Sequence, residues 1–338
     1  MRICRVFIFV NVYIVEKSTD LTKRDKGVDM LKCNRCGKEA IYLQRYSGEA
    51  FCGGCFIEFI ENRVKRTISK YDLFQPEDRI SVALSGGKDS MALLHILSVI
   101  ESSFPKSELI AITIDEGILG YREESIKIAS EICKKLNIEH VITSFKEIYG
   151  HTLDELVERI QCKEGFEPCS VCGVLRRKAL NLLAKKVHAD KLATAHNMDD
   201  EIQTLLINLI NGDVMRIARV EPLLKGKKFV PRAKPLCEVP ENEVALYSFL
   251  RQIKFQSIGC PYIRTSLRND IRNAINKLEL NHPGIKYNIY RAFEKIRPIL
   301  KSSNKDFELK ECKKCGEPSS RDICASCLLL LKSGVVKI

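Results

Sequence analysis

Residues 85–90, Ser-Gly-Gly-Lys-Asp-Ser, combine two glycines, a lysine and two hydroxyl groups in one short turn. The turn follows the apolar segment 80–84, which predicts a buried parallel strand, and precedes helically spaced apolar residues at 91–97. A glycine turn between a strand and a helix directs backbone N–H groups and the helix dipole toward one point, where a phosphate fits. We expect Asp89 and Ser90 to cap this helix. The turn is too short for a Walker A loop, so another type of phosphate-binding turn is predicted.

Two sets of four cysteines have the spacing of tetrahedral metal sites. They are Cys33, Cys36, Cys52 and Cys55 near the N-terminus, and Cys312, Cys315, Cys324 and Cys327 near the C-terminus. Each set consists of two C-x-x-C pairs, the pattern of zinc held by four thiolates, and buried metal-free thiols are the weaker alternative. Because such a site has no open coordination position, we expect two structural Zn²⁺ ions. Their removal should unfold both modules and spare the central domain.

Three further cysteines form a different pattern. Cys169 and Cys172 make a C-x-x-C pair without a partner pair nearby, and Cys260 lies far downstream beside a proline. Three thiolates are too few for a closed zinc site, but they suit a [4Fe–4S] cluster with one iron left without a protein ligand. A redox-active thiol pair and an incomplete zinc site remain alternatives. Cys162 and Cys237 lack any motif and are interpreted as buried or incidental thiols.

The elements that must position these residues alternate between strands and helices. Apolar segments predict further strands at 109–115, 139–142 and 191–195, and helices at 123–136 and 201–206. This alternation indicates an α/β fold with a doubly wound parallel sheet, in which ligands bind at the carboxyl ends of the strands. The glycine turn, Asp115 and residues 196–200 all fall at such ends. Their convergence predicts a nucleotide site.

The length of 338 residues allows one α/β domain flanked by two small zinc-binding modules. We expect a non-native or disordered extension at 1–29, with a short edge strand as the alternative. A zinc module with a basic helix should follow at 30–74, then a catalytic domain at 75–300 and a second zinc module at 301–338. The apolar stretch 6–15 is about half a membrane span and no cleavage signal follows it, so we expect a cytoplasmic protein.

The net charge of +12 favours a polyanionic partner such as nucleic acid. Several clusters of basic residues could contact RNA phosphates, although each could equally be solvated surface. These candidates are Arg63, Lys65 and Arg66; Lys225, Lys227, Lys228, Arg232 and Lys234; and Arg264, Arg268 and Arg272.

The glycine turn, the flanking cysteine modules and the three further cysteines together resemble the PP-loop ATP pyrophosphatases that make 2-thiouridine in tRNA. The resemblance is to the TtuA type, with the wobble-uridine thiolases and TtcA as relatives. Residues 239–247, 260–262, 266–268 and 282–284 resemble TtuA, whereas residues 114–122 and 172–177 resemble the wobble-uridine enzymes. The family activity would be adenylation of a uridine C2 carbonyl by ATP and replacement of the oxygen by sulfur. The expected target is the T-loop uridine, giving 5-methyl-2-thiouridine, with the wobble uridine as the alternative.

The resemblance also implies roles for individual residues. The implied ATP contacts are Ala83, Ser85, Gly86, Gly87, Lys88, Asp89, Ser90, Ile112, Asp115, Ala195 and His196. The implied catalytic residues are Lys88, Asp89, Arg176 and Asp200, with Mg²⁺ and Lys88 neutralising the departing pyrophosphate. Arg176 stands where TtuA usually has lysine, and Ala195 stands where the family often has glycine.

By the same resemblance, Cys169, Cys172 and Cys260 would hold the [4Fe–4S] cluster. Its free iron would receive sulfur from a ubiquitin-like thiocarboxylated carrier protein, tRNA would be the substrate, and the protein would form a homodimer. Three rival hypotheses remain. The cysteines could carry sulfur as a persulfide without iron, the protein could be a PP-loop amide ligase, or it could be a zinc-ribbon RNA-binding protein with a vestigial nucleotide fold.

Overall fold

The computed structural model describes residues 31–161, 167–225, 229–262, 267–302, 310–319, 321–332 and 334. The predictions for the N-terminal extension 1–29 and for Cys162, Lys227, Lys228 and Arg264 therefore lie outside the described residues.

A six-stranded sheet forms the centre of the molecule, in the order β5-β4-β3-β6-β8-β7. Its strands are β3 (Arg79–Ala83), β4 (Glu108–Asp115), β5 (Glu139–Ser144), β6 (Lys191–Ala193), β7 (Leu223–Leu224) and β8 (Arg232–Ala233). All neighbouring pairs are parallel except β7 with β8. The chain order reverses between β3 and β6, which is where an open α/β sheet forms its ligand crevice. The predicted doubly wound fold is confirmed.

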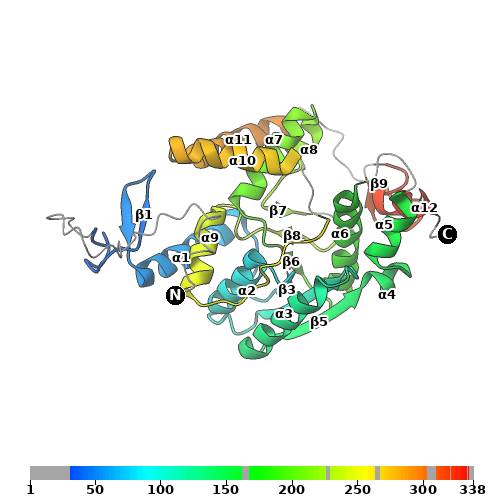
Figure 1. Ribbon diagram of the computed structural model, residues 1–338, viewed down its shortest axis with the longest axis horizontal. Helices are drawn as coiled ribbons and strands as arrows, with labels where there is room; N and C mark the ends of the chain where they lie inside the picture. Colours follow the sequence, from blue (N-terminus) through cyan, green and yellow to red (C-terminus); the bar gives the residue numbers. More distant parts are fainter. Residues whose placement is uncertain are drawn as a thin grey trace.

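Alternation of side chains along the strands divides the core into two layers. Ile80 and Val82 of β3 and Ala111 of β4 face a cluster built with α1 (Gly53–Tyr71), α2 (Lys88–Glu101), α3 (Arg122–Leu136) and α9 (Glu241–Leu250). Ile112 and Ile114 face a second cluster, formed with α4 (Phe145–Tyr149), α5 (Leu153–Gln161), α6 (Pro168–Lys186) and α12 (Ala325–Lys332). The sheet is thus covered on both faces, as Figure 1 shows.

A third group of helices lies beyond the β6 side of the sheet. It consists of α7 (Met198–Ile210), α8 (Val214–Ala218), α10 (Leu267–Asn281) and α11 (Ile285–Ser302). Their apolar faces meet in two small clusters, one around Met198 and Ile271 and one around Leu205 and Phe293. In Figure 1 these helices form a separate layer above the sheet.

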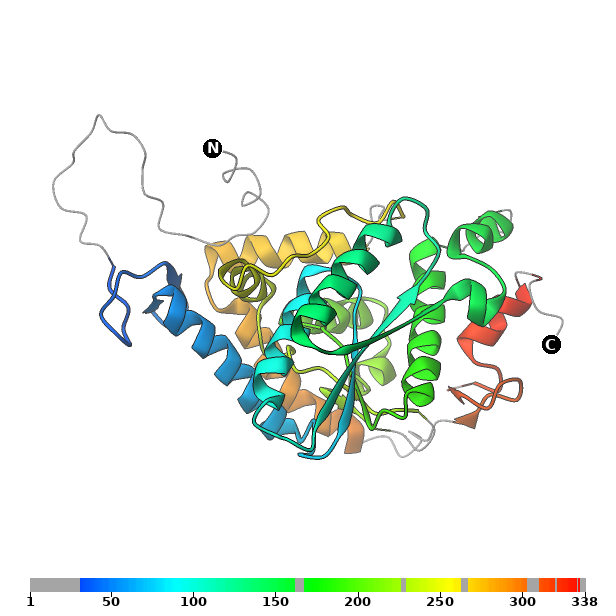
Figure 2. The same cartoon turned by 90° about the horizontal axis from the view of Figure 1, so that it is seen from below.

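The two cysteine modules lie at opposite ends of the molecule (Figures 1 and 2). The first contains the antiparallel pair β1 (Tyr42–Gln44) and β2 (Glu49–Phe51), and the second contains β9 (Lys310–Glu311) and β10 (Pro318–Ser319). Phe51 and Phe56 of the first module belong to the same apolar cluster as α2 and β3. The N-terminal module therefore shares its core with the central sheet.

Two local expectations need correction. Helix α2 begins after Gly87, which takes the N-cap position without a side-chain cap, while Asp89 and Ser90 lie in the first turn. The predicted helix at 201–206 is the middle of the longer α7. Among the helices that the structure describes, none combines the length and apolar composition that a membrane crossing requires.

Candidate functional site

The glycine turn joins β3 to α2 and is held by its own hydroxyl groups. Ser90 Oγ donates to Gly87 O at 2.9 Å and accepts from Ser85 N at 3.2 Å, and Gly87 N donates to Ser85 Oγ at 3.3 Å. Gly86 has φ +78°, and a Cβ there would lie 2.6 Å from Ser125 O. Only glycine fits this position, because the conformation and the close backbone contact both exclude a side chain. The result is a tight cradle at the N-terminus of α2, as phosphate binding requires.

Lys88 lies at the first position of α2 between two carboxylates. Its Nζ is 2.8 Å from Asp89 Oδ1 and 3.4 Å from Glu241 Oε1. Burial disfavours the charged ammonium, but these carboxylates outweigh burial and raise the pKa of Lys88. Arg272 Nη2 contacts the same Glu241 oxygen at 2.6 Å. Two cations thus share one carboxylate beside the phosphate cradle, and a phosphate oxygen could replace that carboxylate.

The carboxyl end of β6 brings a second polar segment to the cradle. Asn197 caps α7, and its backbone N–H donates to Asp200 Oδ2 at 3.2 Å in a reciprocal capping box. Asn197 Nδ2 also lies 3.3 Å from Asp89 Oδ1, which links the two helix N-termini. Burial raises the pKa of Asp200 and of Asp89. His196 is exposed, and its Nδ1 lies 3.0 Å from Thr194 Oγ1.

The residues expected near the adenosine lie along the same strand ends. Ala83 pairs with Ile112 across β3 and β4, and Ile112 O already accepts from Leu84 N at 2.9 Å. Asp115 Oδ1 accepts from Gly117 N at 2.8 Å, so it closes the turn after β4. Ala195 packs against the apolar cluster that includes α2. The structure brings these positions to one edge of the sheet, while their contact with ATP remains a prediction.

Cys169 and Cys172 lie in the first turns of α6, and Cys260 lies on a distant segment that returns to them. Cys172 is buried in the second core cluster, against which Cys260 packs. Cys169 Sγ donates to Tyr262 O at 3.2 Å, two residues beyond Cys260. Burial raises the pKa of both Cys169 and Cys172, and the charge of a Cys260 thiolate would raise both further. The structure therefore brings the three thiols into one region.

An ion bridge, buried at Glu116 and Arg122, connects these thiols to the glycine turn. Glu116, 2 % exposed, contacts Arg122 Nε at 2.7 Å through one carboxylate oxygen and Arg176 Nε at 2.5 Å through the other. Arg122 Nη1 donates to Ser85 O at 2.9 Å, and Arg176 Nη2 donates to Cys172 Sγ at 3.0 Å. An unbroken chain of contacts therefore runs from the phosphate cradle to the thiols. The family resemblance implied a role for Arg176 but none for Glu116 or Arg122, because no spacing signal in the sequence marks this pairing.

Each set of four cysteines places its Sγ atoms within 4.8 Å of one another. Burial disfavours the thiolates of Cys33 and Cys312, yet backbone N–H donors outweigh it and lower both pKa values to about 6. Hydrogen bonding with neighbouring thiols raises the pKa of Cys55 to about 12. A cation between the four Sγ atoms would favour the thiolate form of all of them, and the donor set suits a tetrahedral Zn²⁺ ion. Gly37 and Gly316 have the positive φ of a cysteine knuckle, whereas Gly53 begins α1.

The basic residues expected to contact RNA have different environments. Lys65, Arg66 and Lys225 are exposed. Arg63 is largely buried, with its Nη1 2.6 Å from both Glu243 Oε2 and Tyr287 Oη, so its prediction as an RNA contact is wrong. Lys234 and Arg272 form ion pairs with Glu201 and Glu241, and Arg268 donates to side chains of α7.

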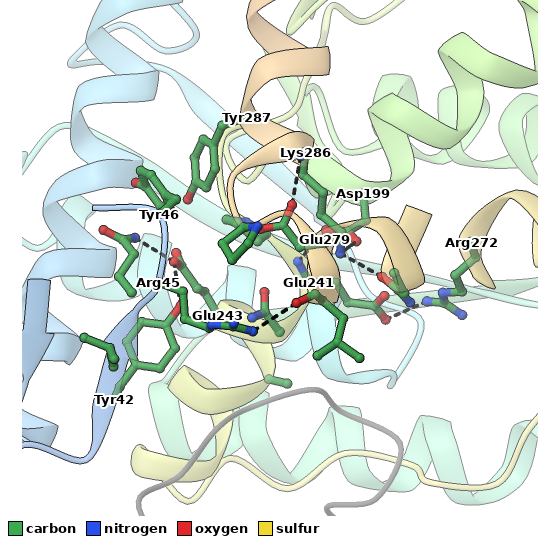
Figure 3. A pocket seen from close by; sticks show the side chains of 18 of the residues that line it. Tyr42, Arg45, Tyr46, Asp199, Glu241, Glu243, Arg272, Glu279, Lys286 and Tyr287 are labelled. Atoms are coloured by element: carbon green, nitrogen blue, oxygen red, sulfur yellow. Dashed lines mark hydrogen bonds and ion pairs between the residues drawn. The ribbon is translucent and has the colours of Figure 1, made fainter. Parts of the chain in front are cut away.

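A cavity of about 490 Å³ has Lys88 in its lining together with residues of the N-terminal module. Figure 3 shows its side chains, with Tyr42 and Tyr46 of that module labelled. Residues of β1, α9, α10 and α11 line it. Its charged groups neutralise one another: Lys286 pairs with Asp199, and Arg272 pairs with Glu241. Glu243, 1 % exposed, accepts from Tyr42 Oη and Gln44 Nε2. The wall therefore suits an uncharged polar group better than a phosphate.

Comparison with known proteins agrees with this geometry. The PP-loop domain family matches residues 58–279, and the N-terminal LIM domain of the 2-thiouridine synthetase TtuA matches residues 32–57. The tRNA 2-thiolation protein NcsA of Haloferax volcanii is 35 % identical, over 89 % of this chain and 98 % of that protein. The tRNA-5-methyluridine(54) 2-sulfurtransferase of Pyrococcus horikoshii is 36 % identical, over 88 % and 93 %.

A solved structure is also similar. It is the U34-tRNA thiolase NcsA from Methanococcus maripaludis with its [4Fe–4S] cluster, with a TM-score of 0.79 and 38 % identity over 90 % of this chain and 97 % of that chain. A phosphate cradle at the switch point of a doubly wound sheet defines the class, an α/β nucleotide-binding protein. Within it, the chain belongs to the PP-loop family of tRNA 2-thiolation sulfurtransferases, the family of NcsA and TtuA.

Proposed function

We propose that this chain is an ATP-dependent tRNA-uridine 2-sulfurtransferase that forms AMP and pyrophosphate. Its proposed target is the T-loop uridine, which would become 5-methyl-2-thiouridine. The observation that carries the proposal is the chain of contacts from Ser85 through Arg122, Glu116 and Arg176 to Cys172. Activation of a base and delivery of sulfur must happen at one place, and this chain joins a phosphate cradle to a group of thiols.

Adenylation needs a cradle that favours the departing pyrophosphate. The uridine O2 oxygen attacks the α-phosphorus of ATP, the bond to the β-phosphate oxygen breaks, and pyrophosphate leaves. The backbone N–H groups at the start of α2 and the Lys88 ammonium stabilise the charge that develops there. Mg²⁺ would be held by the Asp89 carboxylate together with phosphate oxygens, since carboxylate and phosphate are its preferred ligands.

Sulfur delivery needs thiolate ligands close to the activated base. Cys169, Cys172 and Cys260 would hold a [4Fe–4S] cluster. These three thiols are less tightly grouped than the two sets of four, and a cluster is larger than a single Zn²⁺ ion. When bound, the cluster supplies an open iron for a hydrosulfide. The Arg176 guanidinium stays fixed by Glu116 and keeps a positive charge against Cys172, where the reacting sulfur must arrive. Sulfur bonds to C2, the C2–O bond breaks, and AMP carries the oxygen away.

The remaining assignments follow the family. The two four-cysteine modules would hold structural Zn²⁺, a thiocarboxylated ubiquitin-like carrier would supply sulfur, and the protein would act as a cytoplasmic homodimer. The expected modules span 30–74 and 301–338 on either side of the catalytic domain 75–300. The expected ATP contacts remain those at the cradle and at the ends of β3, β4 and β6.

Mass spectrometry of tRNA nucleosides tests the proposal directly. A tRNA that carries 5-methyluridine in its T-loop but no thiolation is incubated anaerobically with reconstituted protein, ATP and sulfide, and the thiolated position is then mapped. We expect 2-thiolation in the T-loop, formation of AMP, and loss of both in Asp89→Ala. Loss of thiolation but not of ATP binding is expected in Cys260→Ala. A colourless, fully active protein would favour the persulfide route, and activity that survives Cys172→Ala would favour an amide ligase.

The wobble uridine is a second candidate target. The solved U34-tRNA thiolase is 38 % identical, a value similar to the 36 % of the 5-methyluridine(54) enzyme. Residues 114–122 also include Glu116 and Arg122 of the ion bridge, and this is the segment that resembles the wobble enzymes. Thiolation that maps to the anticodon in the same experiment would assign the protein to that target.

A further inference from the structure

A second cavity, of about 330 Å³, lies between α6, β8 and the C-terminal module. Three basic side chains line it, those of Arg177 and Lys178 of α6 and Arg232 of β8, while most of the remaining lining is apolar. Among the described residues that line it, Glu317 is the only acidic one. We call this cavity the Arg177–Arg232 pocket. Figure 1 shows α6 beside the module that contains α12.

The charges of this pocket do not cancel. Glu317 is already occupied, because Lys185 Nζ lies 2.8 Å from one oxygen and Asn181 Nδ2 lies 2.7 Å from the other. Lys178 is directed to the C-terminal module, where its Nζ lies 3.7 Å from Cys327 Sγ. Two guanidinium groups, those of Arg177 and Arg232, are therefore left without a carboxylate partner among the described residues.

Within the described part of the chain, the hydrogen bonds of these two arginines go to backbone carbonyls and not to carboxylates. Arg177 Nε donates to Gly173 O at 2.9 Å, and Arg232 Nη2 donates to Arg177 O at 2.9 Å. Arg232 Nε is buried and has no hydrogen-bond partner. Burial and the charge of Arg177 lower the pKa of Arg232 to about 10. The buried N–H of Arg232 lacks a partner, and the guanidinium groups of Arg232 and Arg177 carry like charges. This arrangement favours an anion that accepts hydrogen bonds from both groups.

We propose that the Arg177–Arg232 pocket binds a backbone phosphate of the RNA substrate. The guanidinium fork matches the geometry of a phosphate, and the cavity is open to solvent on the side of the exposed Arg177. The pocket lies close to the ion bridge, since Arg177 follows Arg176 in α6 and Arg232 donates to the backbone oxygen of Arg177. A strand of RNA held here would pass the carboxyl ends of the strands where the phosphate cradle lies. This inference rests on the proposed tRNA substrate.

The test measures tRNA binding by fluorescence anisotropy between about 50 and 200 mM salt, without ATP or sulfide. We expect the double variant Arg177→Gln/Arg232→Gln to bind tRNA about tenfold more weakly. The negative slope of log K against log salt should become shallower by roughly one. The single variant Arg232→Lys keeps the charge and should keep the slope. The matched control is Arg291→Gln/Lys295→Gln, which removes two charges from exposed positions of α11 and should leave the slope unchanged.

An unchanged slope and affinity in the folded double variant would overturn the inference. Thermal unfolding in sodium phosphate, compared with chloride at equal ionic strength, provides a second arm. If the double variant loses stabilisation by inorganic phosphate but keeps its tRNA affinity, the pocket binds a small anion and the RNA assignment is wrong. Because turnover is not measured, failure of the thiolation assay would contradict the proposed function and leave this result unaffected.

Discussion

Lys88 shares its ammonium between Asp89 and Glu241, and this sharing determines the charge that an incoming phosphate meets. The contact with Asp89 is shorter by 0.6 Å (2.8 against 3.4 Å), so Glu241 is the partner that a phosphate oxygen would displace more easily. Glu241 would not be left unpaired, because Arg272 also binds it. The cradle can therefore bind ATP without leaving the Glu241 carboxylate unpaired.

Asp200 has both a structural and a proposed catalytic role, and one substitution separates them. Asp200→Asn keeps an oxygen that can accept from Asn197 N–H, so the cap of α7 should lose less than about 1 kcal/mol of unfolding free energy. The lost carboxylate should reduce thiolation about 100-fold or more if it handles a proton. Denaturant unfolding and single-turnover thiolation measure the two effects. Asn197→Ala is the control for the loss of the cap. Full activity in Asp200→Asn would show that Asp200 only caps α7 and has no catalytic role.

Glu116 should be the most sensitive single position of the ion bridge. Glu116→Gln leaves the buried Arg122 without its counter-charge, which should cost about 3 kcal/mol of unfolding free energy. The exposed Glu123→Gln on α3 is the matched control and should change stability by less than about 0.5 kcal/mol. In a double-mutant cycle with Arg176→Gln the losses should not add, because both residues belong to one network. Additive losses would show that the bridge does not act as a unit.

Some residues of the site were predictable from the sequence and others were not. The glycine turn and the two sets of four cysteines have local spacing, and the structure brings the members of each together. Arg63 looked like an RNA contact because it lies on a basic helix, but it pairs with Glu243, 180 residues later. Glu116 and Glu241 have no local signal either, because each acts through side chains that only the fold brings close.

At the scale of elements, helical periodicity explains how α6 presents its reactive side chains. Cys169, Cys172 and Arg176 are separated by three and four residues, so they lie on one face of the helix. The strands β3 to β6 were predictable from apolar segments. The strands β7 and β8 have two residues each, too short for any periodic pattern to appear.

The turn between β3 and α2 depends on glycine at one position. Gly86→Ala introduces a Cβ that meets Ser125 O at 2.6 Å in a left-handed conformation, so we expect a loss of about 1–3 kcal/mol in stability. ATP binding should weaken at least tenfold, since the cradle must open. Gly54→Ala in α1 has no atom within 4 Å of the new Cβ and serves as the control. Calorimetric unfolding and ATP titration measure both effects, and an unaltered ATP affinity in Gly86→Ala would contradict the account of the cradle.

At the scale of the whole molecule, the two cysteine modules differ in how they are attached. The aromatic residues Tyr42, Phe51 and Phe56 of the first module lie in the cluster that also contains α2, β3 and α9. In the second module, Cys312, Cys324 and Cys327 form a small cluster of their own, and Leu330 of α12 reaches the second core layer. Loss of the first module should therefore expose part of the central core, whereas loss of the second should remain largely local.

A pair of matched substitutions tests this difference. Cys36→Ser and Cys315→Ser each remove one exposed thiol from a four-cysteine set and should each cost one Zn²⁺ ion, counted by elemental analysis. We expect Cys36→Ser to lower the midpoint of the main unfolding transition by several degrees, because the aromatic side chains of the first module are part of the main core. Cys315→Ser should leave that midpoint within about 2 °C and instead add a separate transition at low temperature. Equal shifts in both variants would mean that the C-terminal module stabilises the sheet as strongly as the N-terminal module does, against the contacts that join them.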